Sequence, residues 1–78
     1  MDFETLKYEK ADEGYVVITL NRPERLNAFS RKLNEEMGLA IHEALQDDDV
    51  KCLIITGSPR PDGRPCFSAG GDLKDDTL

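Results

Sequence analysis

The 78-residue chain has no tryptophan, one histidine, two cysteines and no long apolar run, and each shortage excludes a kind of site. Zinc sites need about four clustered ligands, and Cys52 and Cys66 lack a CxxC spacing. We therefore expect no metal, and we interpret both thiols as free and mostly buried. His42 stands beside an apolar stripe, which leaves no Ser-His-Asp or Cys-His catalytic set. No segment approaches the roughly 18 apolar residues of a transmembrane helix, so we expect no contact with a membrane.

Positive charge is also scarce, because the net charge of the chain is −6. A general nucleic-acid-binding protein needs a basic surface, so this class is excluded. Residues 1–4 lack the basic start and apolar centre of a signal peptide, and we expect a cytoplasmic location. The basic residues that are present gather within residues 22–32, where they are Arg22, Arg25, Arg31 and Lys32. This basic cluster is either a solvated face or a patch that binds an anion.

Two strand-like runs open the chain, at residues 3–10 and 15–21, and a short loop containing Gly14 joins them as a β-hairpin. The second run, YVVITLN, is largely apolar on both faces, so we expect both faces to be covered. Pro23 lacks an amide hydrogen and ends this strand near Asn21. Residues 21–29 then form an ordered loop.

The residues after Ser30 have the spacing of an amphipathic helix, for which Ser30 is a suitable N-cap. The apolar face of this helix consists of Leu33, Met37, Ala40, Ile41, Ala44 and Leu45. Glu35, Glu36 and Glu43 fall away from that face, and Gly38 inside the helix indicates close packing.

The run VKCLIITG follows a polar turn of three aspartates and is rich in β-branched residues. Such a strand after a helix favours a βαβ crossover with a parallel strand that is buried on both faces. A loop over residues 57–65 leads to a strand remnant at residues 67–68, a turn at residues 70–71 and a helix that begins at Asp72. We therefore predict an α/β fold that is incomplete, in one partial domain spanning residues 1–78. One helix cannot cover both faces of the sheet, so one apolar face lacks a partner.

Gly70 and Gly71 lie where a strand turns into a helix. Amides at a helix N-terminus lack intrahelical acceptors, and the helix dipole adds a positive potential. Without side chains, the two glycines leave room for an anion or a polarised carbonyl, such as a thioester oxygen that gains charge in an enolate. The alternative is a tight turn that needs the freedom of φ that glycine has and binds nothing. The nucleotide-binding motifs GxGxxG and GxxxxGK[ST] do not occur.

Three segments occur together in order: VVITLNRPERLNAFSRKLNEEM, then CLIITG, then CFSAGGDL. This set closely resembles the N-terminal part of the enoyl-CoA hydratase/isomerase family, the crotonase superfamily, from about Tyr15 to Lys74. The resemblance implies the β-hairpin and βαβ portion of the crotonase fold, which is a spiral of ββα units. It also implies acyl-CoA thioesters as substrates, with coenzyme A arriving as part of the substrate and no separate cofactor. The parent enzyme would assemble as a homotrimer or hexamer.

The resemblance further assigns roles to residues. It makes the backbone amide of Gly71 one of two oxyanion-hole donors to the thioester oxygen, at a position where many relatives have alanine. The residues that it places around the substrate and its coenzyme A are Arg25, Leu26, Ala28, Ala69, Gly70, Gly71, Asp72 and Leu73. Arg25 stands where a basic residue meets the phosphates, and a local positive patch can bind this polyanion despite the negative net charge.

The second oxyanion donor, the acid/base carboxylates and the trimerisation helices come later in the family pattern, and this chain does not contain them. Glu35, Glu36 and Glu43 are no substitutes, because we expect them on the exposed side of the helix, out of reach of a substrate. The leading hypothesis is the N-terminal part of an enzyme that stabilises a thioester enolate, most simply in hydration of a 2-enoyl-CoA. We expect no activity from these 78 residues alone. The alternatives are a short non-catalytic protein that binds CoA thioesters or a protein partner, and a fold remnant without a ligand.

Overall fold

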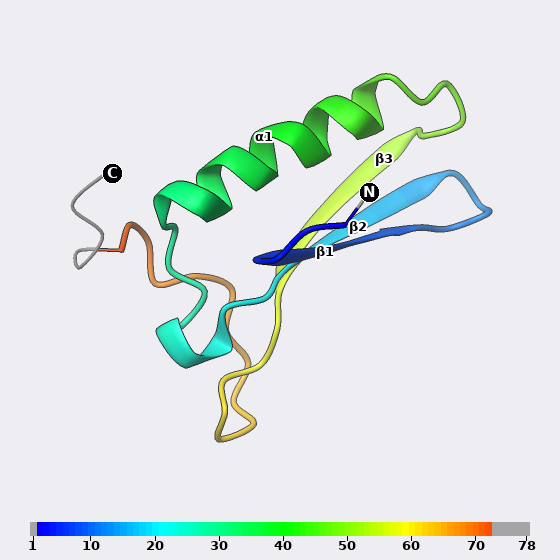
Figure 1. The fold of residues 1–78 in the computed structure, drawn as a ribbon. Helices are drawn as coiled ribbons and strands as arrows, with labels where there is room; N and C mark the ends of the chain where they lie inside the picture. Colours follow the sequence, from blue (N-terminus) through cyan, green and yellow to red (C-terminus); the bar gives the residue numbers. More distant parts are fainter. Residues whose placement is uncertain (1, 73–78) are drawn as a thin grey trace.

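The computed structural model describes residues 2–72 of the chain (Figure 1). In chain order the elements are β1 (Leu6–Lys10), β2 (Tyr15–Leu20), the 3₁₀ turn η1 (Pro23–Arg25), α1 (Arg31–Leu45) and β3 (Cys52–Gly57). Within this part of the chain, no helix is long and apolar enough to cross a membrane.

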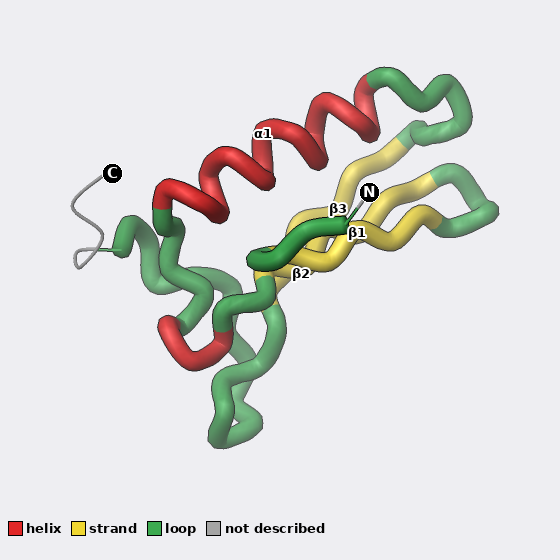
Figure 2. The backbone as a smooth tube through the Cα atoms, in the orientation of Figure 1, coloured by secondary structure: helices red, strands yellow, loops and turns green. Residues whose placement is uncertain are grey.

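The three strands form one mixed sheet in the order β1-β2-β3. β1 pairs with β2 antiparallel, and β2 pairs with β3 parallel. Parallel neighbours need a crossover connection, and α1 supplies it by running along one face of the sheet (Figures 1 and 2). The predicted β-hairpin and βαβ crossover are therefore confirmed.

The hydrophobic core lies between α1 and the sheet face that α1 covers. β2 contributes Val16, Ile18 and Leu20, which are fully buried and alternate along the strand as its pleat requires. The other buried members of this core are Leu6, Leu33, Met37 and Ala40. Burying one large apolar side chain stabilises a fold by about 1.5–3 kcal/mol, so this layer holds α1 against the sheet.

Ser30 caps α1, as predicted. Its hydroxyl accepts a hydrogen bond from the Leu33 amide at 3.2 Å, which satisfies one of the amides at the helix start that lack an intrahelical partner. Gly38 differs from its prediction, because within residues 2–72 no atom outside the neighbouring helix backbone lies within 4 Å of the place where its Cβ would be. This glycine is therefore not a site of close packing.

The sheet face opposite α1 has no cover within residues 2–72. Tyr15, Val17 and Thr19 of β2 are half-buried there, and Ile54 of β3, which pairs with Val17, is 43% exposed on the same face. Ile55 pairs with Ile18 on the face along which α1 runs, and it is 40% exposed there because β3 is an edge strand. The predictions that β2 is covered and β3 is buried on both faces are therefore wrong for this part of the chain. The physical reason is that one helix shields one face, which also confirms the predicted apolar face without a partner.

Two further predictions are corrected by the structure. The cysteines are free, as predicted, but Cys52 is exposed and Cys66 is half-buried, because Cys52 begins a strand with a neighbour on one side only. Residues 67–68 form no strand. The pairing in this part of the chain is instead an isolated parallel bridge between Phe29 and Gly71. The helix predicted to begin at Asp72 falls outside the described residues.

Glu36 on α1 is buried, although the helical pattern predicts that it is exposed. Its carboxylate accepts hydrogen bonds from the amides of Glu4 and Thr5 and from the Thr5 hydroxyl, at 2.5–3.1 Å. Burial by itself would raise the pKa of this carboxyl, but the hydrogen bonds favour its charged form more strongly and lower the pKa below its ordinary value. These bonds draw residues 4–5 to α1, and β1 begins at Leu6 rather than at residue 3.

Candidate functional site

Three loop segments meet beyond the carboxyl ends of the parallel strands β2 and β3 (Figure 1). They are residues 22–29, residues 57–58 and residues 66–72, and together they are termed the loop cluster. In open α/β sheets, ligands bind outside the carboxyl ends of the strands. The loop cluster is therefore the candidate site.

The first segment of the loop cluster folds back on itself. Pro23 opens a single 3₁₀ turn, in which its fixed φ fits and its missing amide hydrogen is not needed. Leu26 and Asn27 then have φ of +54° and +53°, in the left-handed region, which asparagine adopts more readily than most residues. The Asn27 amide closes the turn by donating to the carbonyl oxygen of Arg22 at 2.8 Å. The predicted ordered loop is confirmed, with a turn inside it.

Asn27 is fully buried and connects all three segments of the loop cluster. Its Oδ1 accepts from the Arg22 amide at 2.8 Å, and its Nδ2 donates to the carbonyl oxygen of Ser58 at 2.9 Å. Its own carbonyl oxygen accepts from the Ser68 hydroxyl at 2.8 Å. Buried polar groups need such partners, so Asn27 determines how the three segments meet.

Gly57, at the end of β3, lets the third segment pass very close to the strand. A Cβ at this position would lie 2.3 Å from the carbonyl oxygens of Cys66 and Phe67 and 2.9 Å from Nδ2 of Asn27. No side chain fits at such distances from backbone atoms, and glycine is required for the close approach.

Residues 69–72 lie alongside residues 26–29. Three backbone hydrogen bonds of 2.7–2.9 Å join them, from Ala69 to Leu26, from Phe29 to Gly70 and from Asp72 to Phe29. Phe29 thus forms hydrogen bonds with Gly70 and Asp72, the two neighbours of Gly71, as in a parallel bridge. This arrangement turns the amide and carbonyl of Gly71 away from Phe29. Among the hydrogen bonds within residues 2–72, none is donated by the Gly71 amide. Gly71 is exposed, and Gly70 before it has a φ of +100°, which favours glycine.

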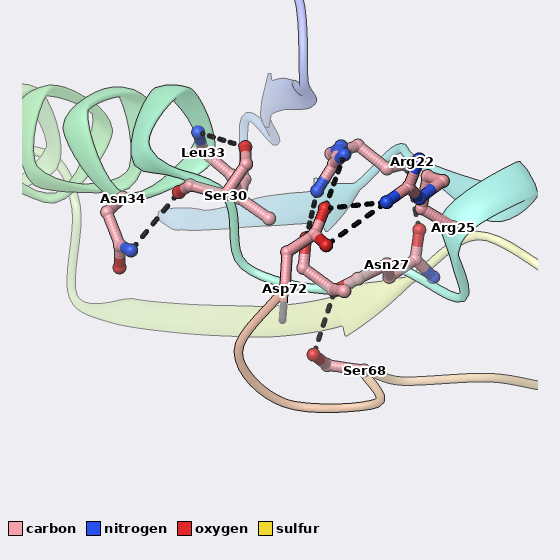
Figure 3. Close-up of polar contacts among 9 residues, drawn as sticks. Arg22, Arg25, Asn27, Ser30, Leu33, Asn34, Ser68 and Asp72 are labelled. Atoms are coloured by element: carbon pink, nitrogen blue, oxygen red, sulfur yellow. Dashed lines mark hydrogen bonds and ion pairs between the residues drawn. The ribbon is translucent and has the colours of Figure 1, made fainter. Parts of the chain in front are cut away.

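Asp72 forms ion pairs with two arginines of the first segment, and these three residues are termed the arginine–aspartate cluster (Figure 3). Nη2 of Arg22 lies 3.1 Å from Oδ2 of Asp72, and Nη2 of Arg25 lies 3.1 Å from Oδ1. Arg22 also donates from Nη1 to the carbonyl oxygen of Ala28. The side chains of Asp72 and Arg22 are 7% and 16% exposed, so salt screens this pair only weakly.

The described residues offer no metal site, because within residues 2–72 no three His, Cys, Asp or Glu side chains gather closely enough to hold an ion. What the loop cluster presents is the backbone amide of Gly71, which donates no hydrogen bond within residues 2–72 and is followed in sequence by an aspartate that pairs with two arginines. Such a set suits a ligand with a polarised carbonyl and an anionic part.

The family model for enoyl-CoA hydratase/isomerase matches residues 10–77, which is most of the chain. The chain belongs to the enoyl-CoA hydratase/isomerase family. This membership confirms the resemblance seen in the three sequence segments, and with it the crotonase superfamily.

Known relatives agree with this assignment. The 1,2-epoxyphenylacetyl-CoA isomerase of Escherichia coli strain K12 is 38% identical over 64 residues, which are 82% of this chain and 22% of that protein. The probable enoyl-CoA hydratase echA8 of Mycobacterium bovis is 39% identical over 75 residues, or 96% of this chain and 27% of that protein. A solved enoyl-CoA hydratase/isomerase from Mycobacterium paratuberculosis has a TM-score of 0.81 and 41% identity, over 94% of this chain and 26% of its own.

The chain therefore spans about a quarter of the length of these family members. Over that quarter, the hairpin, crossover helix and parallel strand follow the solved relative, so the predicted portion of the crotonase fold is confirmed.

The predicted site residues within the described part all lie in the loop cluster. They are Arg25, Leu26, Ala28, Ala69, Gly70, Gly71 and Asp72. Ala28 and Asp72 are buried, whereas the others are exposed. Leu73, the last predicted site residue, lies outside the described residues. The structure thus brings these positions together, and their contact with coenzyme A stays a prediction.

Three residues of the loop cluster are missing from the predicted site: Arg22, Asn27 and Ser68. Arg22 belongs to the basic cluster, but its charge alone does not reveal the buried carboxylate that it meets. An asparagine in a turn is a common left-handed residue, which is the one local signal for Asn27. Ser68 has no such signal, because its partner is 41 positions away in the chain.

Proposed function

We propose that the loop cluster binds an acyl-CoA thioester and that the Gly71 amide donates a hydrogen bond to the thioester oxygen as it becomes an enolate. The simplest reaction of the whole protein is hydration of a 2-enoyl-CoA, and double-bond isomerisation is the nearest variant. Family membership supports the substrate class, and the name of one relative specifies a CoA thioester.

The observation that carries this proposal is the orientation of Gly71. The bridge to Phe29 occupies Gly70 and Asp72 and leaves the Gly71 amide outward on an exposed residue. A preorganised amide of this kind stabilises a developing oxyanion, and removing one such donor lowers kcat by about 10²–10³-fold in other enzymes.

In this proposal, Arg25 binds the anionic part of the same ligand. It contacts Asp72 through Nη2, its side chain is 40% exposed, and its other guanidinium nitrogens make no hydrogen bond within residues 2–72. Those nitrogens are available to a phosphate group of coenzyme A. Arginine suits this role because its planar fork matches phosphate oxygens.

We assign no acid/base residue within residues 2–72. Glu36 is engaged by Glu4 and Thr5, and the Asp72 carboxylate is engaged by the two arginines. The proposal therefore concerns binding and oxyanion stabilisation, and the proton transfers belong to the whole protein. Its assembly as a homotrimer or hexamer and its cytoplasmic location stay predictions.

The test compares Gly71→Pro with Gly71→Ala in the protein at its natural length, using crotonyl-CoA as the substrate. Proline removes the amide hydrogen, so turnover should fall by about 10²–10³-fold. Alanine keeps the amide, and turnover should stay within a few fold. Circular dichroism and thermal unfolding establish that both variants are folded.

A folded Gly71→Pro protein with unchanged turnover contradicts the proposal. Calorimetry with crotonyl-CoA separates the remaining outcomes: binding without any wild-type turnover supports the non-catalytic CoA-thioester-binding alternative. Neither binding nor turnover in the wild type leaves the plain turn as the role of the two glycines.

A further inference from the structure

Arg22 belongs to the first segment of the loop cluster and contacts the third segment, which contains Gly71. Its Nη1 donates to the Ala28 carbonyl oxygen in the first segment, and its Nη2 pairs with Asp72 in the third (Figure 3). Although Arg22 is only 16% exposed, it contacts a main-chain oxygen on one side and a carboxylate on the other. One guanidinium therefore ties the two segments together.

We propose that Arg22 and Asp72 are a positioning pair that holds the Gly71 amide in its outward orientation. This inference rests on the proposed function, because it gives the pair its purpose, but the restraint itself is a property of the fold. Neither residue contacts the reacting oxygen in this proposal, and both act through Gly71.

The two glycines explain why a restraint is needed. Gly70 and Gly71 have no side chains to pack, and glycine backbone is more mobile than that of other residues. Asp72 is the first residue after them with a side chain, and it is buried. Its amide bonds to Phe29 and its carboxylate to Arg22, so Asp72 is fixed at both its backbone and its side chain.

Arg22 and Arg25 both pair with the Asp72 carboxylate, but their roles differ. The side chain of Arg22 is nearly buried and bonds to both segments, whereas the side chain of Arg25 is 40% exposed and within residues 2–72 bonds only to Asp72. Losing a buried partner leaves an uncompensated charge, so Arg22 is the structural half of the cluster. Arg25 is left for the ligand, as proposed above.

The test uses steady-state kinetics with crotonyl-CoA and the protein at its natural length. Arg22→Met should lower kcat by about 10- to 100-fold with little change in KM, because a displaced oxyanion donor weakens the transition state most. Asp72→Asn should act in the same direction. Arg22→Lys keeps the charge but cannot fork between Ala28 and Asp72, and it should restore kcat in part.

Two variants separate this effect from a change of charge. Arg64→Met removes an arginine that is 73% exposed and pairs with Asp62, outside the loop cluster, so its kinetics should match the wild type. Arg25→Met removes the more exposed partner of Asp72 and should raise KM by a larger factor than it lowers kcat. A folded Arg22→Met protein whose kcat matches that of Arg64→Met, or whose loss lies wholly in KM, overturns the proposal.

Hydrogen exchange of the ligand-free protein tests the pair without relying on turnover. The Ala69 and Asp72 amides bond to Leu26 and Phe29, so their exchange should quicken by about tenfold or more in Arg22→Met and stay as in the wild type in Arg64→Met. Unchanged exchange in Arg22→Met also overturns the proposal. Faster exchange in a protein that neither binds nor converts crotonyl-CoA supports the restraint and refutes the proposed function.

Discussion

The side-chain amide of Asn27 donates a hydrogen bond to the carbonyl oxygen of Ser58 at 2.9 Å. These residues lie 31 positions apart, one in the turn after β2 and the other just after β3. Asn27 also has the left-handed φ that reverses the first segment. The same residue therefore shapes its own turn and fastens that turn to the end of the parallel strand.

Replacing Asn27 by alanine should destabilise the protein by about 2–4 kcal/mol, because it leaves the Arg22 amide and the Ser58 carbonyl buried without their partner. Alanine is also strained at a φ of +53°. Urea denaturation followed by circular dichroism measures the change in the free energy of unfolding.

Asn34→Ala is the matched control for this loss. Asn34 is exposed on α1 and makes one side-chain bond, to the carbonyl oxygen of Ser30. Its replacement should change the free energy of unfolding by no more than about 0.5 kcal/mol. If Asn27→Ala costs no more than Asn34→Ala, then Asn27 does not hold the loop cluster together.

Two glycines should respond to alanine in opposite directions. At Gly57 a Cβ would lie 2.3 Å from two carbonyl oxygens, so Gly57→Ala must push the third segment away and should cost more than about 2 kcal/mol. At Gly38 the space is open and the backbone is helical, so Gly38→Ala should stabilise the protein by about 0.5–1 kcal/mol. Thermal unfolding of both variants measures the sign of each change in stability. Equal changes would show that the third segment moves away from Gly57 at little cost.

Local patterns predict the elements of this fold well. The stripe of apolar residues after Ser30 predicts α1 and its cap, and the alternation in YVVITL predicts the buried face of β2. These features depend on neighbours within about four positions in the sequence, where helix and strand periodicity acts. The order of hairpin, helix and strand then determines the crossover.

Burial and polar partners are harder to predict, because they depend on distant segments. Glu36 fits an exposed helix position, and its partners in residues 4–5 are 31 or 32 positions away. In β3 the apolar run indicates burial on both faces, yet Ile54 lies on the sheet face without a covering layer within residues 2–72, and Ile55 is 40% exposed on the other face, at the edge of the sheet. The candidate site shows the same limit, since family resemblance locates Gly71 and Asp72 but not the arginine that restrains them.

Arg25→Met should weaken the binding of coenzyme A by about 3- to 10-fold at low salt, because the exposed part of its guanidinium is proposed to meet a phosphate. The difference from the wild type should shrink at about 1 M salt, where exposed charges are strongly screened. Isothermal titration calorimetry with coenzyme A measures both effects, and Arg64→Met serves as the charge-matched control. An equal loss in both variants would mean that only net charge matters.

Glu36→Gln should lower the free energy of unfolding at neutral pH. It should also make this free energy depend less on pH in the acid range. The pKa of Glu36 is lowered in the folded protein by hydrogen bonds from Glu4 and Thr5. Its carboxylate therefore stabilises the fold fully above the unfolded pKa of about 4.3, and this contribution is lost as the pH falls through the lower, folded pKa. At pH 7, glutamine should cost about 1.5–3 kcal/mol, because it replaces hydrogen bonds to a charged acceptor.

The measurement is urea denaturation of the wild type and Glu36→Gln between pH 7 and about pH 3, in the acid range where Glu side chains titrate. The two free energies of unfolding should converge as the pH falls, because protonation removes the advantage of the wild-type carboxylate. Glu35→Gln is the control, since Glu35 is exposed and pairs with Arg31 on the helix surface, and its curve should run close to the wild type. A gap between wild type and Glu36→Gln that stays constant down to the acid limit would mean that packing, and not the charge on Glu36, holds residues 4–5 against α1.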